Sequence, residues 1–207
     1  MRFVAAALAA VAVLAPASAV ASGTFVAPPK PGPAGLELVP VPQVPVLAQP
    51  AAVHLGETID GIQCQQIEKI AFHIHAHLSI FVDGKQKQIP YGIGIGAPLE
   101  GQPDKVSPFV TLGSCFMWLH THTADGIIHM EAPKQITFNL GEFFDIWGQK
   151  LSSSQVGPAK GTVTALVDGK VVSGDPRSIV LKDHELIQLD VGSPLVGMQK
   201  VTFGQLS

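Results

Sequence analysis

Six of the eight histidines lie in two short clusters. The first alternates with apolar residues in the segment 72–82, FHIHAHLSIFV, which contains His73, His75 and His77. Alternate residues of a β-strand point to the same face of a sheet. The pattern therefore predicts a strand with one apolar face and one face of histidines.

The second cluster lies on a predicted hairpin in the segment WLHTHTADGIIHME. The Asp-Gly pair at 125–126 tolerates the positive φ of a two-residue turn. With that turn, His122 lies opposite His129, and His120 lies opposite Glu131. Directly opposed residues share a face and have Cβ atoms about 4.5 to 5.5 Å apart. The hairpin would thus present three imidazoles and one carboxylate on a small patch of sheet.

This set of side chains suits a divalent transition-metal ion. Three neutral imidazoles and a carboxylate are ligands that Zn²⁺, Cu²⁺ and Fe²⁺ accept. We expect the histidine face of the 72–82 strand to cover the patch and to supply one or two further ligands, because its three histidines span about 13 Å. The others would orient ligands, bind a second ion or meet solvent. The predicted metal-site residues are His120, His122, His129, Glu131, His75, His73 and His77.

Two functions fit such a site. The first is a non-catalytic protein that sequesters, delivers or senses copper or zinc, which the surplus of histidines and the nearby Met117 and Met130 favour. The second is a metal-dependent enzyme, a hydrolase, lyase or oxygenase, in which one coordination position stays open and Glu131 or Asp125 acts as base. A structural or adhesion domain is a third alternative. The sequence favours the first function. His54 and the turn residue His184, outside both clusters, are interpreted as structural.

Only two cysteines occur, Cys64 and Cys115. In an oxidising compartment, such a pair in an otherwise cysteine-free exported chain most simply forms one disulfide. The alternative is that Cys115 serves as a copper thiolate beside His120, with Met117 or Met130 as the weak axial ligand. The sequence favours the disulfide.

The N-terminus predicts export. Arg2 precedes an apolar run that ends at Ala15, and small residues at 17–21 offer a cleavage site, so residues 1–21 are typical of a signal peptide. Its removal would leave a net charge of −3 − 1 = −4. We expect a periplasmic or extracellular location, with no transmembrane segment in the mature chain and no protein partner identified.

The segment 22–50 is rich in proline, with eight prolines between 27 and 50. Such a composition predicts an extended, polyproline-like linker that acts as a spacer. The folded domain would then run from 51 to 207 as a single unit. The low charged fraction of 14% and the net charge of −3 argue against nucleic acid as a partner.

The remaining patterns predict a mainly β domain, sandwich-like or barrel-like with antiparallel hairpins. The tetrapeptide VDGK occurs at 82–85 and again at 167–170, and both copies suit two-residue hairpin turns. The segment 139–150 predicts one short amphipathic helix, with Asn139 as its N-cap. Strands are expected at 179–181 and 185–191, joined by a turn that contains His184. An α+β domain of the β-grasp kind is the alternative.

Three sequence blocks, HIHAHLSIFVDGK, CFMWLHTHTADGIIHME and FNLGEFFDIWGQ, are similar to blocks that recur in this order in a group of exported bacterial proteins. The resemblance covers residues 63–150 and implies a shared site, without naming a reaction. The cupin family also uses H-x-H with a glutamate and a later histidine, but Glu131 lies nine residues after His122, further than in that motif. Zinc lyases of the carbonic-anhydrase type show a looser similarity.

Overall fold

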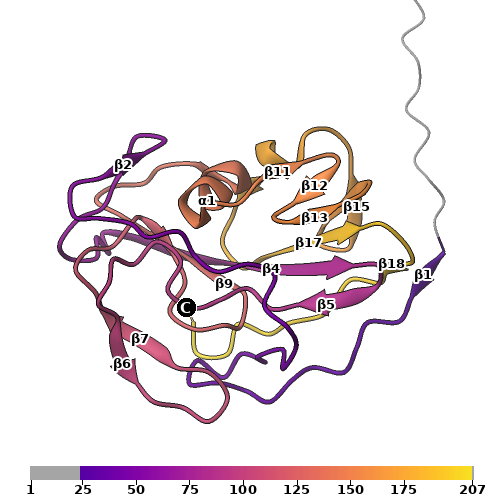
Figure 1. The fold of residues 1–207 in the computed structure, drawn as a ribbon, viewed down its shortest axis with the longest axis horizontal. Helices are drawn as coiled ribbons and strands as arrows, with labels where there is room; N and C mark the ends of the chain where they lie inside the picture. Colours follow the sequence, from indigo (N-terminus) through magenta and orange to yellow (C-terminus); the bar gives the residue numbers. More distant parts are fainter. Residues whose placement is uncertain (1–23, 207) are drawn as a thin grey trace, which may run out of the picture.

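A computed structural model describes residues 24–206 of the chain (Figure 1). These residues form a mainly β structure with a single α-helix, which confirms the predicted fold class. The predicted signal peptide at 1–21 lies outside the described residues. Within the described range, no helix has the length and apolar character needed to cross a membrane.

A seven-stranded sheet forms the centre of the fold, in the order β15-β14-β17-β4-β9-β8, and β5 pairs with the end of β4 (Figure 1). Its strands are β4 (Phe72–Val82), β5 (Lys85–Lys87), β8 (Leu119–His120), β9 (Ile127–Ala132), β14 (Val163–Val167), β15 (Lys170–Val172) and β17 (Glu185–Val191). The β17–β4 pair is parallel, and the other pairs are antiparallel. The strand β4 lies at the middle and is the longest.

Short strand pairs surround the main sheet. They are β1 (Phe25–Val26) with β18 (Leu195–Val196), β2 (Thr58–Ile59) with β3 (Ile62–Gln63), β6 (Glu100–Gln102) with β7 (Phe109–Leu112), β10 (Phe138–Asn139) with β16 (Val180–Leu181), and β11 (Leu151–Ser152), β12 (Gln155–Val156) and β13 (Ala159–Lys160) together. A 3₁₀ turn, η1 (Pro176–Ser178), precedes β16.

Both VDGK tetrapeptides form the predicted hairpin turns. They connect β4 to β5 and β14 to β15. The two aspartates, Asp83 and Asp168, have φ values of 48° and 47°, and the following Gly84 and Gly169 also have positive φ. Two successive residues with positive φ are what a type I′ turn requires.

The predicted helix is confirmed as α1 (Leu140–Trp147). The Asn139 side chain accepts from the backbone N–H of Glu142, and the Glu142 carboxylate accepts from the backbone N–H of Asn139 at 2.7 Å, which completes a capping box. Gly148 ends the helix in the left-handed conformation. The aromatic side chains Phe143, Phe144 and Trp147 are fully buried in the hydrophobic core.

The two faces of the main sheet differ in chemistry. One face carries Ala76, Leu78 and Ile80 of β4 and Ile128 and Met130 of β9, all within the hydrophobic core that also contains the aromatic residues of α1. Because successive residues of a strand point to opposite faces, the histidines of β4 and β9 must lie on the other face.

The proline-rich segment lies along the domain and does not stand away from it, and it is not extended throughout (Figure 1). Val39 and Val41 are fully buried, and Leu47 N donates to Gln88 O at 2.9 Å. Between Ala34 and Pro40 the segment folds back on itself in a tight antiparallel turn, in which Leu38 has a φ of 61°. Glu37, Val39 and Val41 are the inward residues, so this segment covers part of the domain and differs from the expected spacer.

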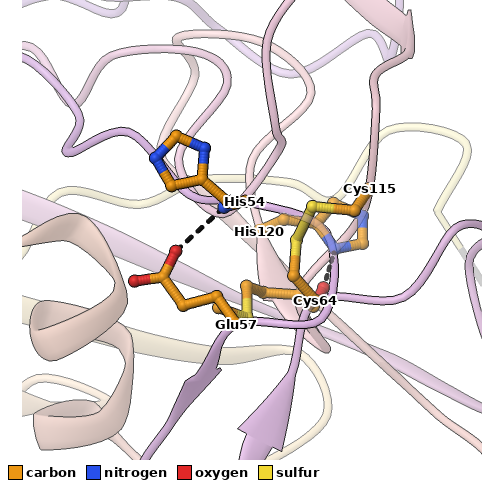
Figure 2. Close-up of a disulfide and its surroundings, with 6 residues drawn as sticks. His54, Glu57, Cys64, Cys115 and His120 are labelled. Atoms are coloured by element: carbon orange, nitrogen blue, oxygen red, sulfur yellow. Dashed lines mark hydrogen bonds between the residues drawn. A yellow bond between two sulfur atoms is a disulfide. The ribbon is translucent and has the colours of Figure 1, made fainter.

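Cys64 and Cys115 form the predicted disulfide, and Figure 2 shows it in close-up together with His120. Both sulfurs are therefore engaged, which excludes the alternative of a Cys115 thiolate ligand. An adjacent bridge between Gln65 and Phe116 runs beside the disulfide. The two connections fix the chain just before β8, the strand that carries His120.

Removing the disulfide should destabilise the protein substantially. The bond closes a loop with a sequence separation of 51 residues. On the chain-entropy argument, such a crosslink contributes about 4 kcal/mol by restricting the unfolded chain. We expect the Cys64→Ala/Cys115→Ala variant to unfold at lower urea concentration by a corresponding amount. Equal urea midpoints for variant and wild type would contradict this.

Candidate metal centre

Three neighbouring strands place the histidines in one row. In the register of β4 with β9, His75 lies opposite His129, and in the register of β9 with β8, His129 lies opposite His120. Two residues further along the same pair of strands, β4 and β9, His73 lies opposite Glu131. Directly opposed residues share a face and lie close. The pairing of three strands therefore gathers residues that are up to 58 positions apart in sequence, from His73 to Glu131.

The predicted register of the second cluster is wrong by two residues. His120 lies opposite His129, not opposite Glu131, and His122 lies beyond the end of β8. The Asp-Gly pair at 125–126 is not a two-residue hairpin turn, because residues 121–126 form an irregular loop held by side-chain bonds from Thr121 and Asp125. A shift of two residues keeps every side chain on its face, so the predicted grouping survives the error.

The position of β4 also differs from the prediction. The strand was expected to cover the second cluster from a facing layer, but it pairs edge to edge with β9 in the same sheet. Other segments of the chain cover the histidine face of the sheet. The Phe109 ring of β7 stacks on His122 with a centroid distance of 5.0 Å. The carboxylates of Glu37 and Glu68 approach from the proline-rich segment and from the chain before β4.

Four side chains form the most compact group of potential ligands. They are His120, His122, His129 and Glu131, whose ligand atoms all lie within 4.8 Å of one another. Their exposed fractions range from 0% to 7%. Oε1 of Glu131 lies 3.9 Å from Nε2 of His120 and 3.9 Å from Nδ1 of His129. The group is therefore closed to bulk solvent and contains the donor set of a transition-metal site.

The tautomers of His120 and His122 follow from their backbone contacts. Nδ1 of His120 lies 2.9 Å from the carbonyl of Met117, and Nδ1 of His122 lies 2.6 Å from the carbonyl of Val110. A carbonyl oxygen can only accept, so each Nδ1 carries the hydrogen and donates it. A neutral imidazole has one N–H, which leaves both Nε2 atoms as bare lone pairs. These two atoms lie 3.2 Å apart.

Several other polar atoms at the site have no hydrogen-bond partner within the described chain. They are both ring nitrogens of His129, both ring nitrogens of His75, Oε2 of Glu131, Oε2 of Glu37 and Oδ2 of Asp125. Buried polar groups are normally satisfied, because an unpaired one costs about 1 to 3 kcal/mol. A concentration of such atoms around one point is a feature of a ligand or ion site, and the residues present fit a metal ion.

Sequence reasoning missed Glu37 and Glu68. Oε1 of Glu37 lies 3.3 Å from Nε2 of His129, and Oε1 of Glu68 lies 3.6 Å from Nε2 of His122. The sequence around Glu37 gives no signal for its burial, because Glu37 lies between Leu36 and Leu38, which are the exposed residues here. No local pattern singles out Glu68.

The other predicted residues lie around this group in different ways. His73 and His75 form a second potential ligand group with His129. Nε2 of His77 instead lies 2.9 Å from the carbonyl of Asp125 and is held there, outside every group of potential ligands among the described residues. The Asp125 carboxyl, considered as a base, is buried beside Glu37.

The two methionines do not contribute donors. Met117 and Met130 are both fully buried in the hydrophobic core, on the opposite face of the sheet. Only the carbonyl of Met117 takes part, as the partner of His120. These thioethers therefore do not support the expected binding of copper or zinc.

Burial sets the charge of the site in the absence of an ion. It lowers the pKa of His75 and of His122 to about 4. It also lowers the pKa of His120 and of His129 well below the usual value, with neighbouring imidazoles adding to the effect. Burial raises the pKa of Glu131 to about 8. The site is thus a cluster of neutral imidazoles and a neutral carboxyl group at pH 7, the protonation state in which imidazole binds metal ions.

Glu37 and Asp125 form a second electrostatic feature of the site. Burial, and the Asp125 carboxyl beside it, raise the pKa of Glu37 to about 9. Burial raises the pKa of Asp125 to about 6, although the Ile127 N–H donates to it. Two carboxyl groups in contact cannot both ionise at low cost. An added cation would favour their ionised forms.

Comparisons of the chain with protein-family models, with curated proteins and with solved structures find no match. The similarity to a group of exported bacterial proteins therefore stays a prediction.

The metal-free protein should be most stable between about pH 4.5 and 6.5. A histidine with a lowered folded pKa contributes stability that is present above 6.5 and lost as the pH falls toward 4, as for His77. A carboxyl group with a raised pKa contributes stability that is present below 4.5 and lost as the pH rises, toward 8 for Glu131 and 9 for Glu37. Between pH 4.5 and 6.5 both contributions are partly lost. Below pH 4.5 only the histidine contribution still falls, and above pH 6.5 only the carboxyl contribution does, so stability decreases toward both extremes.

Urea unfolding of chelator-treated protein at acidic, intermediate and alkaline pH measures this profile. The Glu37→Gln/Glu131→Gln variant is the matched control, because it lacks the groups that titrate above pH 6.5. Its alkaline loss of stability should be smaller than that of the wild type. A wild-type urea midpoint that rises steadily into the alkaline range would contradict the assignment.

Proposed function

We propose that this protein is a non-catalytic metal-binding protein that holds one divalent ion, zinc or copper, between His120, His122, His129 and Glu131. The observation that carries the proposal is the pair of Nε2 atoms of His120 and His122, which face each other at 3.2 Å with their lone pairs free. Two acceptors at this distance repel unless a cation lies between them.

The distance between these two atoms matches metal coordination. Nitrogen ligands about 2.0 to 2.1 Å from a tetrahedral ion lie about 3.3 Å from each other. A shared proton is a poorer solution, because burial lowers the pKa of both imidazoles. The backbone carbonyls that fix Nδ1 of each ring are the orienting partners that metal-bound histidines commonly have.

The donor set narrows the choice of metal. Three nitrogens and one oxygen suit Zn²⁺ or Cu²⁺, whereas Cu⁺ prefers thiolate or thioether sulfur. Sulfur ligands are absent from this group, since the cysteines form a disulfide and the two nearby methionines lie in the core. Non-haem Fe²⁺ sites usually use two histidines and one carboxylate with open positions. A third buried histidine makes iron the less suitable ion.

The burial of the ligands favours binding over catalysis. A catalytic ion keeps a position open for water or substrate, whereas structural and storage sites are closed. The four side chains are at most 7% exposed. This supports sequestration, delivery or sensing of the metal more than an enzymatic role with Glu131 or Asp125 as base. The predicted signal peptide and the disulfide support action outside the cytoplasm.

Protein purified without a histidine tag should contain about one equivalent of a single metal by mass spectrometry. The His120→Ala/His122→Ala/His129→Ala variant should lose it, because three of the four ligands are removed. The His54→Ala variant is the control, since His54 is exposed and lies outside all the potential ligand groups of the described chain. Circular dichroism would establish that the triple variant folds.

If the triple variant does not fold, the His122→Ala variant provides the test, because His122 lies on the loop beyond β8 and not within the sheet. Zinc should raise the thermal midpoint of the wild type, since it binds the folded state, and should raise that of the variant less. Metal-free wild-type protein that takes up neither zinc nor copper at micromolar concentration would overturn the proposed function.

Glu37 should tune the affinity of the site without serving as a ligand. Its carboxylate lies against Nε2 of His129, the position from which such groups orient a metal-bound imidazole. Loss of an orienting partner typically weakens metal binding about 10-fold to 100-fold. We expect Glu37→Gln to have an effect of this size in a zinc competition assay. Glu100→Gln, at an exposed position of β6, is the control, and equal affinities of the two variants would contradict the role of Glu37.

A further inference from the structure

A separate group of potential ligands lies at the edge of the site. It consists of His75, Asp183 and His184, whose ligand atoms lie within 4.8 Å of one another. It shares no residue with the buried group of His120, His122, His129 and Glu131. The turn residue His184, interpreted from the sequence as structural, thus meets the histidine face of β4.

His75 is the buried member of this group. It is 1% exposed, and neither ring nitrogen has a hydrogen-bond partner within the described residues. Its ring packs against those of His73 and His129, with centroid distances of 4.5 and 4.8 Å. An unpaired imidazole in such surroundings lacks a partner that can use its lone pair, and Asp183 and His184 are exposed groups placed to share an ion with it.

The backbone fixes the other two members beside His75. His184 N donates to the His75 carbonyl at 2.6 Å, and His75 N donates to Oδ1 of Asp183 at 3.3 Å. The strand β17 begins directly after them, in parallel register with β4. The C-terminal Phe203 packs on the His184 ring, with a centroid distance of 4.6 Å. The side chains of Asp183 and His184 remain 48% and 43% exposed.

We propose that His75, Asp183 and His184 form a second, solvent-accessible site for a divalent transition-metal ion, and that this surface site loads the buried one. This inference rests on the proposed function, because the surface site would provide the route by which an ion enters the buried site. Two imidazoles and one carboxylate bind such an ion with positions left for water. With fewer protein ligands, the surface site holds the ion more weakly than the buried site does.

Shared ligands connect the surface site to the buried one. His75 belongs both to the surface site and to the group it forms with His73 and His129. His129 belongs to that middle group and to the buried site. An ion can therefore pass inward by exchanging ligands. It remains coordinated by His75 in the first step and by His129 in the second. The surface and buried sites share no ligand, so both can be filled at once.

Calorimetric titration of the metal-free, full-length mature protein with zinc tests the proposal. We expect two phases in the wild type, with the tight phase lost in His120→Ala/His122→Ala and the weak phase lost in Asp183→Ala/His184→Ala. The second variant changes exposed side chains and should fold. Its matched control is His54→Ala/Glu57→Ala, which removes another histidine and carboxylate that lie close together (Figure 2) and belong to none of the potential ligand groups of the described residues.

The rate of loading tests the route. At zinc below one equivalent, transfer from a chromophoric chelator to the buried site should be slower in Asp183→Ala/His184→Ala than in the wild type, with the affinity of the tight phase unchanged. A weak phase that is lost while the loading rate stays the same overturns the loading role. A weak phase that persists in this variant, or a wild type with the tight phase alone, overturns the second site and leaves the proposed function intact. A wild type that binds no zinc overturns both.

Discussion

The antiparallel pairing of β4 with β9 is the interaction on which the rest of the structure depends. It places His75 opposite His129 and His73 opposite Glu131, and β8 extends the row to His120. The same register sends the alternate residues of both strands into the hydrophobic core. A slip of one residue would bury imidazoles in the core and expose apolar side chains on the other face. The core and the site therefore enforce each other's register.

The cover on the histidine face gives the site its chemistry. An open row of imidazoles would be solvated and would titrate near its ordinary range. Here the proline-rich segment, with Glu37, Val39 and Val41 turned inward, removes water from the row. Burial then keeps the imidazoles neutral and the carboxyl groups protonated. A neutral, desolvated cluster of lone pairs is unfavourable alone and favourable around a cation, which is the physical basis of the proposed function.

The overlapping ligand groups relate affinity to access. A fully enclosed site holds an ion firmly but exchanges it slowly unless a path leads to it. His75 and His129 each belong to two adjacent groups, so the histidine face offers continuous coordination from the exposed turn before β17 to the buried ligands. The protein has more histidines than one ion needs. The proposed loading route, in addition to the buried site, accounts for the surplus.

The sequence by itself determined the features that depend on neighbouring residues. Strand alternation in 72–82, the two Asp-Gly hairpin turns of VDGK, the capping box of α1 and the cysteine pair were all predictable, because each follows from local backbone preferences or from simple pairing. The grouping of His120, His122 and His129 with Glu131 also followed from parity along the strands. Only the tertiary structure decided the register of β8 with β9, the pairing of β4 beside β9, and the contacts of Glu37, Glu68 and Asp183. These depend on long-range packing and on loop conformation, for which the local sequence carries no period or motif.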